Sequence, residues 1–277
     1  MFTRLLVGLD GSAGSDAALT AALGLARRFK GTIVLAAITD IRLLEAPLLE
    51  VAGSMWAEGA PVGPVAAELR EALEERATRL LEAAAARVGE AGLAVETVRA
   101  TGLVEEELLR LAEDAEAIAV GRRGERHGEA GTLGAVTSHI IRHSSKPVFV
   151  AGDAPSECER PVVAYDGGTT STHAVELAAR YAEALGKPLA VVHVAERADD
   201  GDTLLARAAA FLSERGAAFE THRLTGDVVR AVTDFIASYR ADLLVAGAHG
   251  GRGRRWTIGS HAARLLRATS IPVIIQR

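Results

Sequence analysis

Short apolar runs without polar alternation recur along the chain, separated by longer segments with helical periodicity. The run LLVGLD at residues 5–10 leads into the helical pattern SDAALTAALGLARRF, and a second apolar run, TIVLAAI, follows at residues 32–38. Strands that are apolar at successive positions are buried on both faces, as in a parallel sheet covered by helices. Alternating strands and helices of this kind predict an α/β fold with an open, doubly wound parallel sheet.

The same order of elements occurs twice. The run VVAYD at residues 162–166 again ends in Asp-Gly and again leads through a helical pattern into an apolar run, PLAVVHV at residues 188–194. Asp10 and Asp166 are 156 positions apart, and the stretches that follow them align without gaps. Such self-similarity indicates an internal duplication of one structural unit.

The later parts of the two copies align at a smaller offset. AVETVRATG at residues 94–102 matches AFETHRLTG at residues 218–226, an offset of 124. The first copy therefore carries about 30 additional residues, which we place at about 41–80. This insert combines a segment with Pro and Gly and a long helical run. We expect an extended helical hairpin there; a lid or a partner surface is the alternative.

A short polar segment, AGDAPSECER at residues 151–160, separates the copies and forms the natural boundary between two domains. The length of 277 residues suits two compact domains. We therefore expect a first domain at residues 1–152, including the insert, and a second at residues 160–277. Both are predicted to be doubly wound parallel-sheet domains in tandem, with a Rossmann-like arrangement.

Composition narrows the class of protein. Hydrophobic residues make up 49% of the chain but aromatic residues only 4%, so the cores are aliphatic. The net charge of −5 gives no electrostatic reason to expect a nucleic acid or membrane partner. A single cysteine, Cys158, excludes an intrachain disulfide and is interpreted as a tolerated surface or linker thiol. Because the chain shows neither a signal peptide nor an apolar run of roughly 18 residues, we expect a cytoplasmic protein.

The first candidate for chemistry is a glycine-rich loop. The strand AIAVG ends at Gly121, Gly124 follows, and Gly134 opens the helical pattern AVTSHIIRHS. Glycine lets the backbone approach a ligand closely, and the free amides at a helix start favour phosphate. Arg122, Arg123 and Arg126 add positive charge. Taken alone, this loop also fits an ordinary turn with solvated arginines.

The second copy repeats the loop at the same place. Gly247 and Gly250 follow the strand DLLVA, and Gly259 and Ser260 open the helical pattern HAARLLRATS. Three further arginines lie in this loop: Arg252, Arg254 and Arg255. Repetition of the glycine pair, the basic loop and the glycine-started helix favours a phosphate site over a plain turn.

The pattern Gly-x2-Gly-x9-Gly with Ser or Thr after it, downstream of a strand that ends in Asp-Gly, resembles the ATP-binding motif of the universal stress protein family. The resemblance covers nearly the whole chain, twice. It implies that the glycines and hydroxyl residues hold the phosphates and ribose, while the aspartate and the second strand lie at the adenine end. The implied first-copy residues are Asp10, Ala37, Gly121, Gly124, Gly134, Ala135, Val136 and Thr137, and we add Arg122 as a candidate because of its charge. Those of the second copy are Asp166, Val192, Gly247, His249, Gly250, Gly259 and Ser260.

Both copies depart from the family pattern. Ala135 stands where the first copy should carry Ser or Thr, although Thr137 supplies a hydroxyl nearby. In the second copy only eight residues separate Gly250 from Gly259, and His261 and Ala262 replace the usual residues. We therefore expect the first copy to be the better-formed site.

Rival interpretations of individual residues remain open or are disfavoured. Asp10 and Asp166 fit helix capping as well as ligand binding, and His249 fits a solvated loop position as well as a phosphate neighbour. Gly8, Gly11 and Gly14 with Asp40 resemble a dinucleotide-binding fingerprint, but their spacing of Gly-x2-Gly-x2-Gly does not match it. His193 lies within an apolar strand and is interpreted as a core residue.

The resemblance implies an ATP-binding regulator of the stress response, with or without Mg²⁺, and without substantial turnover. No catalytic residue and no protein metal ligand is nominated. Two alternatives are an interaction module that has lost nucleotide binding and an enzyme, either a slow ATPase or an adenylate-forming catalyst.

In the family, single domains dimerise through their last strands. Here PVFV at residues 147–150 and PVII at residues 272–275 would make that contact within one chain. An unidentified protein partner is expected, and association of two chains is left open.

Overall fold

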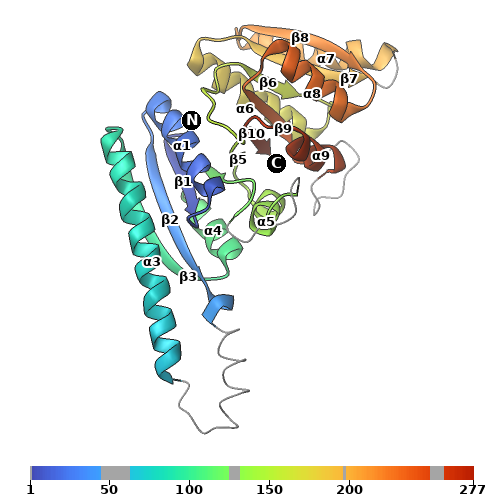
Figure 1. Ribbon diagram of the computed structural model, residues 1–277. Coiled ribbons are helices and arrows are strands. Elements are labelled where there is room, and N and C mark those ends of the chain that lie inside the picture. Colours follow the sequence, from blue (N-terminus) through green and yellow to red (C-terminus); the bar gives the residue numbers. More distant parts are fainter. Residues whose placement is uncertain (1, 45–62, 125–131, 196–197, 250–258) are drawn as a thin grey trace.

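The computed structural model (Figure 1) describes residues 2–44, 63–124, 132–195, 198–249 and 259–277. In the first half, strands and helices alternate as the sequence predicts. The elements are β1 (Arg4–Leu9), α1 (Ala13–Phe29), β2 (Thr32–Asp40), α3 (Gly63–Glu90), β3 (Ala94–Gly102), α4 (Val104–Ala112), β4 (Ala117–Val120), α5 (Ala135–His143) and β5 (Val148–Val150).

The second half repeats this order. Its elements are β6 (Pro161–Ala164), α6 (Thr169–Leu185), β7 (Leu189–Ala195), α7 (Ala198–Glu214), β8 (Phe219–Thr225), α8 (Val228–Tyr239), β9 (Leu243–Gly247), α9 (Ser260–Ala268) and β10 (Val273–Gln276). The predicted α/β class is therefore confirmed. Among the described residues, no helix has the length and apolar character that crossing a membrane requires.

All ten strands belong to one sheet with the order β3-β2-β1-β4-β5-β10-β9-β6-β7-β8. Within each half the strands are parallel, and the two halves meet where β5 and β10 pair antiparallel. Phe149 lies opposite Ile274 at the centre of this pairing. The contact expected between the last strands of the two copies is thus present, and it merges two five-stranded sheets into one.

Side chains of successive strand residues alternate between two cores, one on each face of the sheet. In β1, Leu5 and Val7 point into the core beneath α1, α3, α6 and α7, whereas Leu6 points into the core beneath α4, α5, α8 and α9. All three are fully buried. Burial on both faces explains why the strands read as continuous apolar runs.

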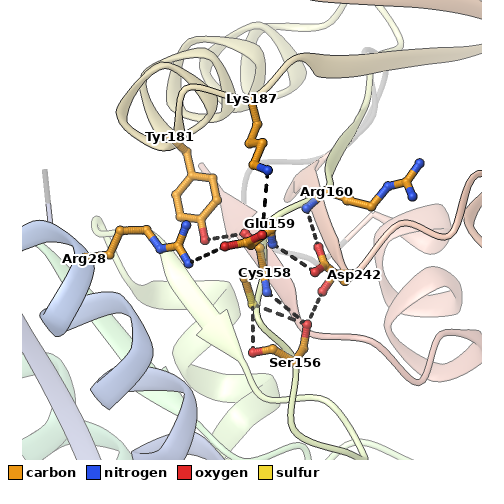
Figure 2. A network of polar contacts seen from close by, with 8 residues as sticks. All are labelled: Arg28, Ser156, Cys158, Glu159, Arg160, Tyr181, Lys187 and Asp242. Atoms are coloured by element: carbon orange, nitrogen blue, oxygen red, sulfur yellow. Dashed lines mark hydrogen bonds and ion pairs between the residues drawn. The ribbon is translucent and has the colours of Figure 1, made fainter. Parts of the chain in front are cut away.

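The segment between the halves is fixed by polar contacts (Figure 2). The Asp242 carboxylate accepts hydrogen bonds from the backbone amides of Glu159 at 2.9 Å and Arg160 at 2.6 Å. The Tyr181 hydroxyl donates to the carbonyl of Cys158 at 2.8 Å. These bonds dock the connecting segment onto the second half.

The first half holds the same segment from the other side. The Glu159 carboxylate is 3.2 Å from the Arg28 guanidinium of α1 and 3.8 Å from the Lys187 ammonium. Beside it, the rings of Phe2 and Phe29 pack against Tyr181 at centroid distances of 6.2 and 5.7 Å. The connecting segment between the copies is therefore packed against both halves and is not a free linker.

Cys158 is more buried than a surface or linker thiol was expected to be. It lies in the connecting segment as predicted, but its side chain is only 4% exposed, so it is not a surface thiol. Burial raises the pKa of the thiol to about 12. Sequence composition around Cys158 is polar, and only the packing of Tyr181 and Arg28 over the segment reveals the burial.

Part of the region expected to be an insert has a counterpart in the second half, namely the C-terminal part of the long helix α3. It has 28 residues, whereas α7 has 17, and the two helices pack at equivalent places, α3 on β2 and β3 and α7 on β7 and β8. The C-terminal part of α3 is therefore the counterpart of α7, and only its first turns are additional. Figure 1 shows α3 running along the outer edge of the first half. The remainder of the predicted hairpin, residues 45–62, lies outside the described residues.

We call the β5–β10 pairing and the side chains packed on it the joint between the halves. Truncation at its centre tests the contribution of the joint to stability. We expect Phe149→Ala to lower the free energy of unfolding by about 3–5 kcal/mol, because it leaves a cavity in the middle of the sheet. Ile41→Ala is the control, because Ile41 is 36% exposed and should change stability little. Urea denaturation measures both. A loss below about 1 kcal/mol for Phe149→Ala would show that the joint does not depend on this packing.

The thiol of Cys158 gives a second test. With a pKa near 12, the folded protein should carry the reactive thiolate in only about one molecule in ten thousand at pH 8. A colourimetric thiol reagent should therefore react very slowly at pH 8 and quickly once urea unfolds the chain. Rapid reaction of the native protein would contradict the burial of this residue.

Candidate functional site

A cavity of about 310 Å³ opens at the carboxyl ends of β1, β2 and β4. The strand order places β1 between β2 and β4, which is where the chain changes direction across the sheet. Ligands of doubly wound sheets bind at such switch points. The cavity wall contains every first-copy residue singled out in the sequence except one: Asp10, Ala37, Gly121, Gly124, Gly134, Ala135, Val136 and Thr137.

Two loops meet at the cavity with their backbones in contact. A Cβ atom on Gly121 would lie 2.6 Å from the carbonyl oxygen of Gly14, and a Cβ atom on Gly124 would lie 2.5 Å from Oδ2 of Asp10. Only glycine allows the strand ends to approach this closely. The glycines predicted for the ligand loop thus also hold the loop after β4 against Asp10 and the first turn of α1.

The loop after β1 is ordered by local hydrogen bonds. Oδ1 of Asp10 accepts from the amide of Ser12 at 2.9 Å, and Oγ of Ser12 caps α1 by accepting from the amide of Ser15 at 3.1 Å. Ser12, not Asp10, is therefore the N-cap residue of α1. Asp10 both shapes the turn and lines the cavity, so the two interpretations of this residue are compatible.

The first turn of α5 faces the cavity. The amide of Gly134 donates to the carbonyl of Arg122 at 2.9 Å, and the Thr137 hydroxyl donates to the carbonyl of Gly121 at 2.7 Å. These bonds hold the start of the helix against the end of β4. Gly134 is the N-cap residue and has no side chain with which to cap the helix. The first amides of α5 therefore present donors suited to an anion.

Three arginines line the part of the cavity wall that the structure describes. Arg42 is bound by two acids: its Nε lies 2.8 Å from Asp40, and its two Nη atoms each lie 3.0 Å from Glu105. These carboxylates raise the pKa of Arg42 and match its charge. Arg76 reaches from α3 and donates to the carbonyl of Asp10 at 2.8 Å, while Arg123 lies in the glycine loop.

The opposite end of the cavity is apolar. Its wall is formed by Ala36 and Ile38 of β2 and by Val104 and Leu108 of α4. A Cβ atom on Gly8 would lie 3.3 Å from Leu108, so this end is narrow. The cavity therefore pairs an apolar slot with a donor-rich loop, which suits a ligand that has a flat apolar part and an anionic part.

Arg122 was expected to add charge to the ligand loop, and the structure corrects this. Its side chain points away from the cavity and is only 9% exposed. The guanidinium donates to the carbonyls of Ala151, Leu266 and Ile271, two of which belong to the second half. Arg123, which was also expected to add charge to this loop, does line the cavity, and so does Arg76 of α3, which the sequence analysis did not single out. The helical spacing of Leu73, Arg76 and Leu80 on α3 is the signal that could have identified Arg76.

In the second copy the corresponding backbones are also in contact, since a Cβ atom on Gly247 would lie 2.6 Å from the amide nitrogen of Ser171, and a side chain adds to this contact. The Thr170 hydroxyl, at the position of Gly14, donates to the carbonyl of His249 at 2.6 Å and accepts from its amide at 3.2 Å. Asp166 accepts from the amide of Gly168 at 2.9 Å and from the Ser171 hydroxyl at 2.5 Å. The described part of this loop is therefore held together by its own side chains.

Other second-copy residues fall into three groups. Val192 is buried within β7, and the neighbouring His193 is a hydrogen-bonded core residue as predicted, with Nδ1 2.8 Å from the carbonyl of Tyr165. The amide of Gly259 donates to the carbonyl of Ala248 at 2.8 Å, as Gly134 does to Arg122 in the first copy. Gly250 lies outside the described residues, as do the second-copy arginines Arg252, Arg254 and Arg255. The first-copy Arg126 lies outside them too. For Ser260 only the backbone, at the start of α9, is described.

Comparison with known proteins points to one family over the whole chain. The universal stress protein family matches residues 1–152 and 159–277. The universal stress protein Slr1230 of Synechocystis sp. is 29% identical over 290 residues, with 99% of each chain covered. A universal stress protein of Mycolicibacterium smegmatis is 28% identical over 297 residues, which cover 99% of this chain and 96% of that protein.

Solved structures share the fold. The crystal structure of a universal stress protein from Archaeoglobus fulgidus superposes with a TM-score of 0.79 at 21% identity, covering 99% of this chain and 96% of that chain. The resemblance noted in the sequence and the tandem α/β fold inferred from it are therefore confirmed.

The close contact of the two loops predicts a difference between glycines. Gly121→Ala should lower the free energy of unfolding by about 1–3 kcal/mol, because the new methyl group meets the backbone of Gly14. Gly24→Ala in α1 is the matched control: nothing lies within 4 Å of its Cβ position, so it should stabilise by about 0.5–1 kcal/mol. Thermal or urea unfolding of both variants decides. Equal effects would mean that the loops are not in contact.

Proposed function

Because the chain belongs to the universal stress protein family, we propose that its first half binds ATP, with or without Mg²⁺, as a regulatory ligand. The observation that carries this proposal is the cavity at the carboxyl end of the sheet. It gathers Asp10, the end of β2, the glycine loop and the first turn of α5, which are the parts that the family motif predicts. Their chemistry fits the group: an apolar slot, free helix amides and arginine side chains.

In the proposed complex the phosphates lie against the glycine loop. The amides of Gly124, Ala135 and Val136 would supply hydrogen bonds, and the dipole of α5 would favour the negative charge. Arg123 and Arg76 would add positive charge from two sides, and Mg²⁺ would be carried by the phosphate oxygens. Ala135 offers an amide but no hydroxyl. Since the Thr137 hydroxyl proton is bound to Gly121, affinity should be modest.

The base and ribose would occupy the other end. The adenine ring fits between β2 and α4, against Ile38 and Leu108, where burial of a flat ring is favourable. Backbone groups at the end of β2 can bind its edge. Asp10 can accept a hydrogen bond from a ribose hydroxyl or the adenine amino group, as an ionised carboxylate has acceptor sites beyond the one used by Ser12.

A holding role is favoured over turnover. Among the described residues of the cavity wall, two carboxylates occur and both have partners: Asp10 binds the amide of Ser12, and Asp40 binds the side chain of Arg42. Asp40 is bound to a guanidinium and Asp10 is assigned to the ribose or the adenine in the proposed complex, so neither is assigned to the activation of water. We therefore propose that occupancy, and not hydrolysis, is the signal that a protein partner reads in a stress response.

Calorimetric titration with Mg-ATP, after removal of any nucleotide carried through purification, tests the proposal. The parent should bind with the first-copy site as the principal one. Gly124→Asp should weaken that binding by at least about tenfold, because a second carboxylate beside Asp10 repels phosphate. Gly89→Asp is the matched control, since it adds the same charge on α3 at a position with no neighbour within 4 Å.

Each alternative function has its own outcome in this experiment. No binding by the nucleotide-free parent at millimolar ATP would reject the proposal and leave an interaction module with the family fold. Release of phosphate at a rate that follows the occupancy of the site would instead identify an ATPase. Equal affinity of Gly124→Asp and parent would place the ligand elsewhere.

A further inference from the structure

Arg122 lies in the glycine loop but serves the joint between the halves. Its chain neighbours Gly121 and Arg123 line the cavity, whereas its own guanidinium is buried on the far side of the loop. Nε donates to the carbonyl of Ala151 at 3.0 Å, Nη2 to Ile271 at 2.5 Å and Nη1 to Leu266. One side chain thus spans a sequence distance of more than a hundred residues.

The three carbonyls explain why this position favours an arginine. Ala151 follows β5, Ile271 precedes β10, and Leu266 lies in the last turn of α9, where carbonyls have no partner within the helix. A cation at that helix end is also favoured by the dipole. The planar guanidinium carries five N–H donors directed outward, so it can bind all three carbonyls at once.

Burial makes these bonds a strong constraint. It lowers the pKa of Arg122, against the opposing effect of Asp153, whose carboxylate lies 3.8 Å away. A guanidinium that has lost its water depends on the protein for hydrogen bonds. Rotation of residue 122 would break three bonds together, so the side chain fixes the orientation of the loop backbone.

The backbone of Arg122 connects this joint to the cavity. Its carbonyl accepts from the amide of Gly134, which starts α5. In the second copy the matching residue is Ala248, whose carbonyl accepts from Gly259 in the same way but whose methyl group cannot reach across the joint. The contact therefore has no equivalent from the second copy: Arg122 binds the loop of the first half to α9 of the second half, and Ala248 makes no matching bond to the first half.

We propose that Arg122 is a positioning residue that couples the nucleotide site of the first half to α9. It holds residues 121–124 in the binding conformation by anchoring them on the second half. A nucleotide bound to this loop in turn reduces the local opening of α9, the helix that begins after Gly259, the last glycine of the second motif. Coupling of this kind is reciprocal, so weakening the anchor lowers nucleotide affinity. This inference rests on the proposed function.

Three variants separate positioning from stability. Arg122→Met keeps an unbranched stem but removes all donors, and Arg122→Lys keeps the charge with a smaller set of donors. Tyr181→Phe is the matched control, because it removes one hydrogen bond from the same joint on the opposite face of the sheet (Figure 2). All three should be less stable than the parent in urea denaturation.

Nucleotide affinity and hydrogen exchange give the decisive readouts. In the parent, saturating Mg-ATP should slow amide exchange in residues 260–272 as well as at the start of α5. Arg122→Met should bind about tenfold more weakly and lose the response of residues 260–272 at saturation, and Arg122→Lys should fall between. Tyr181→Phe should keep both the affinity and the response.

The outcomes distinguish the two proposals. A parent that does not bind ATP rejects the proposed function and this inference with it. A parent that binds, with residues 260–272 unresponsive and with unchanged affinity in the arginine variants, rejects the coupling alone. If Arg122→Met does not fold, Arg122→Lys decides by the same two readouts. An equal loss of affinity in Tyr181→Phe would reduce Arg122 to a purely structural residue.

Discussion

The antiparallel pairing of β5 with β10 is the interaction on which the rest of the molecule depends. Three residue pairs, centred on Phe149 and Ile274, join two parallel sheets into one of ten strands. On one face the joint is covered by the Tyr181 cluster and the connecting segment, and beside it Arg122 reaches from the loop after β4 to the second half. Because the glycine loop begins at β4, next to β5, its position is set by this joint as much as by its own half.

The two halves share a fold but have diverged around their switch points. Where the first half has only backbone contact between Gly14 and Gly121, the second half adds a hydrogen bond from the Thr170 hydroxyl to the carbonyl of His249. Where the first half has Arg122, the second has Ala248. Such differences make the two halves chemically inequivalent at their switch points, and the proposed division into a binding half and a responding half depends on this inequivalence.

The fold could be predicted from the sequence because its signals are local and repeated. Apolar runs, helical periodicity and the two Asp-Gly turns recur at constant offsets, and they identify the strands and their order of occurrence. The candidate site was predictable to the extent that its residues belong to backbone motifs, as with Gly124 and Gly134. Residues whose role depends on side-chain direction or distant packing were not: Arg122 bonds a carbonyl 144 positions away, and Cys158 is buried by residues of both halves. Arg76 belongs to the cavity only because α3 packs across β2, which the interrupted alignment of the copies concealed.

A crystal structure of the full chain grown with ATP and Mg²⁺ would show whether the first half binds a nucleotide. We expect a nucleotide in the first half, with its phosphates on the amides of residues 124 and 134–136, its base between β2 and α4, and the guanidinium of Arg122 still bound to Leu266 and Ile271. A nucleotide bound elsewhere on the chain, or a first-half cavity that contains none at a saturating concentration, would contradict this expectation.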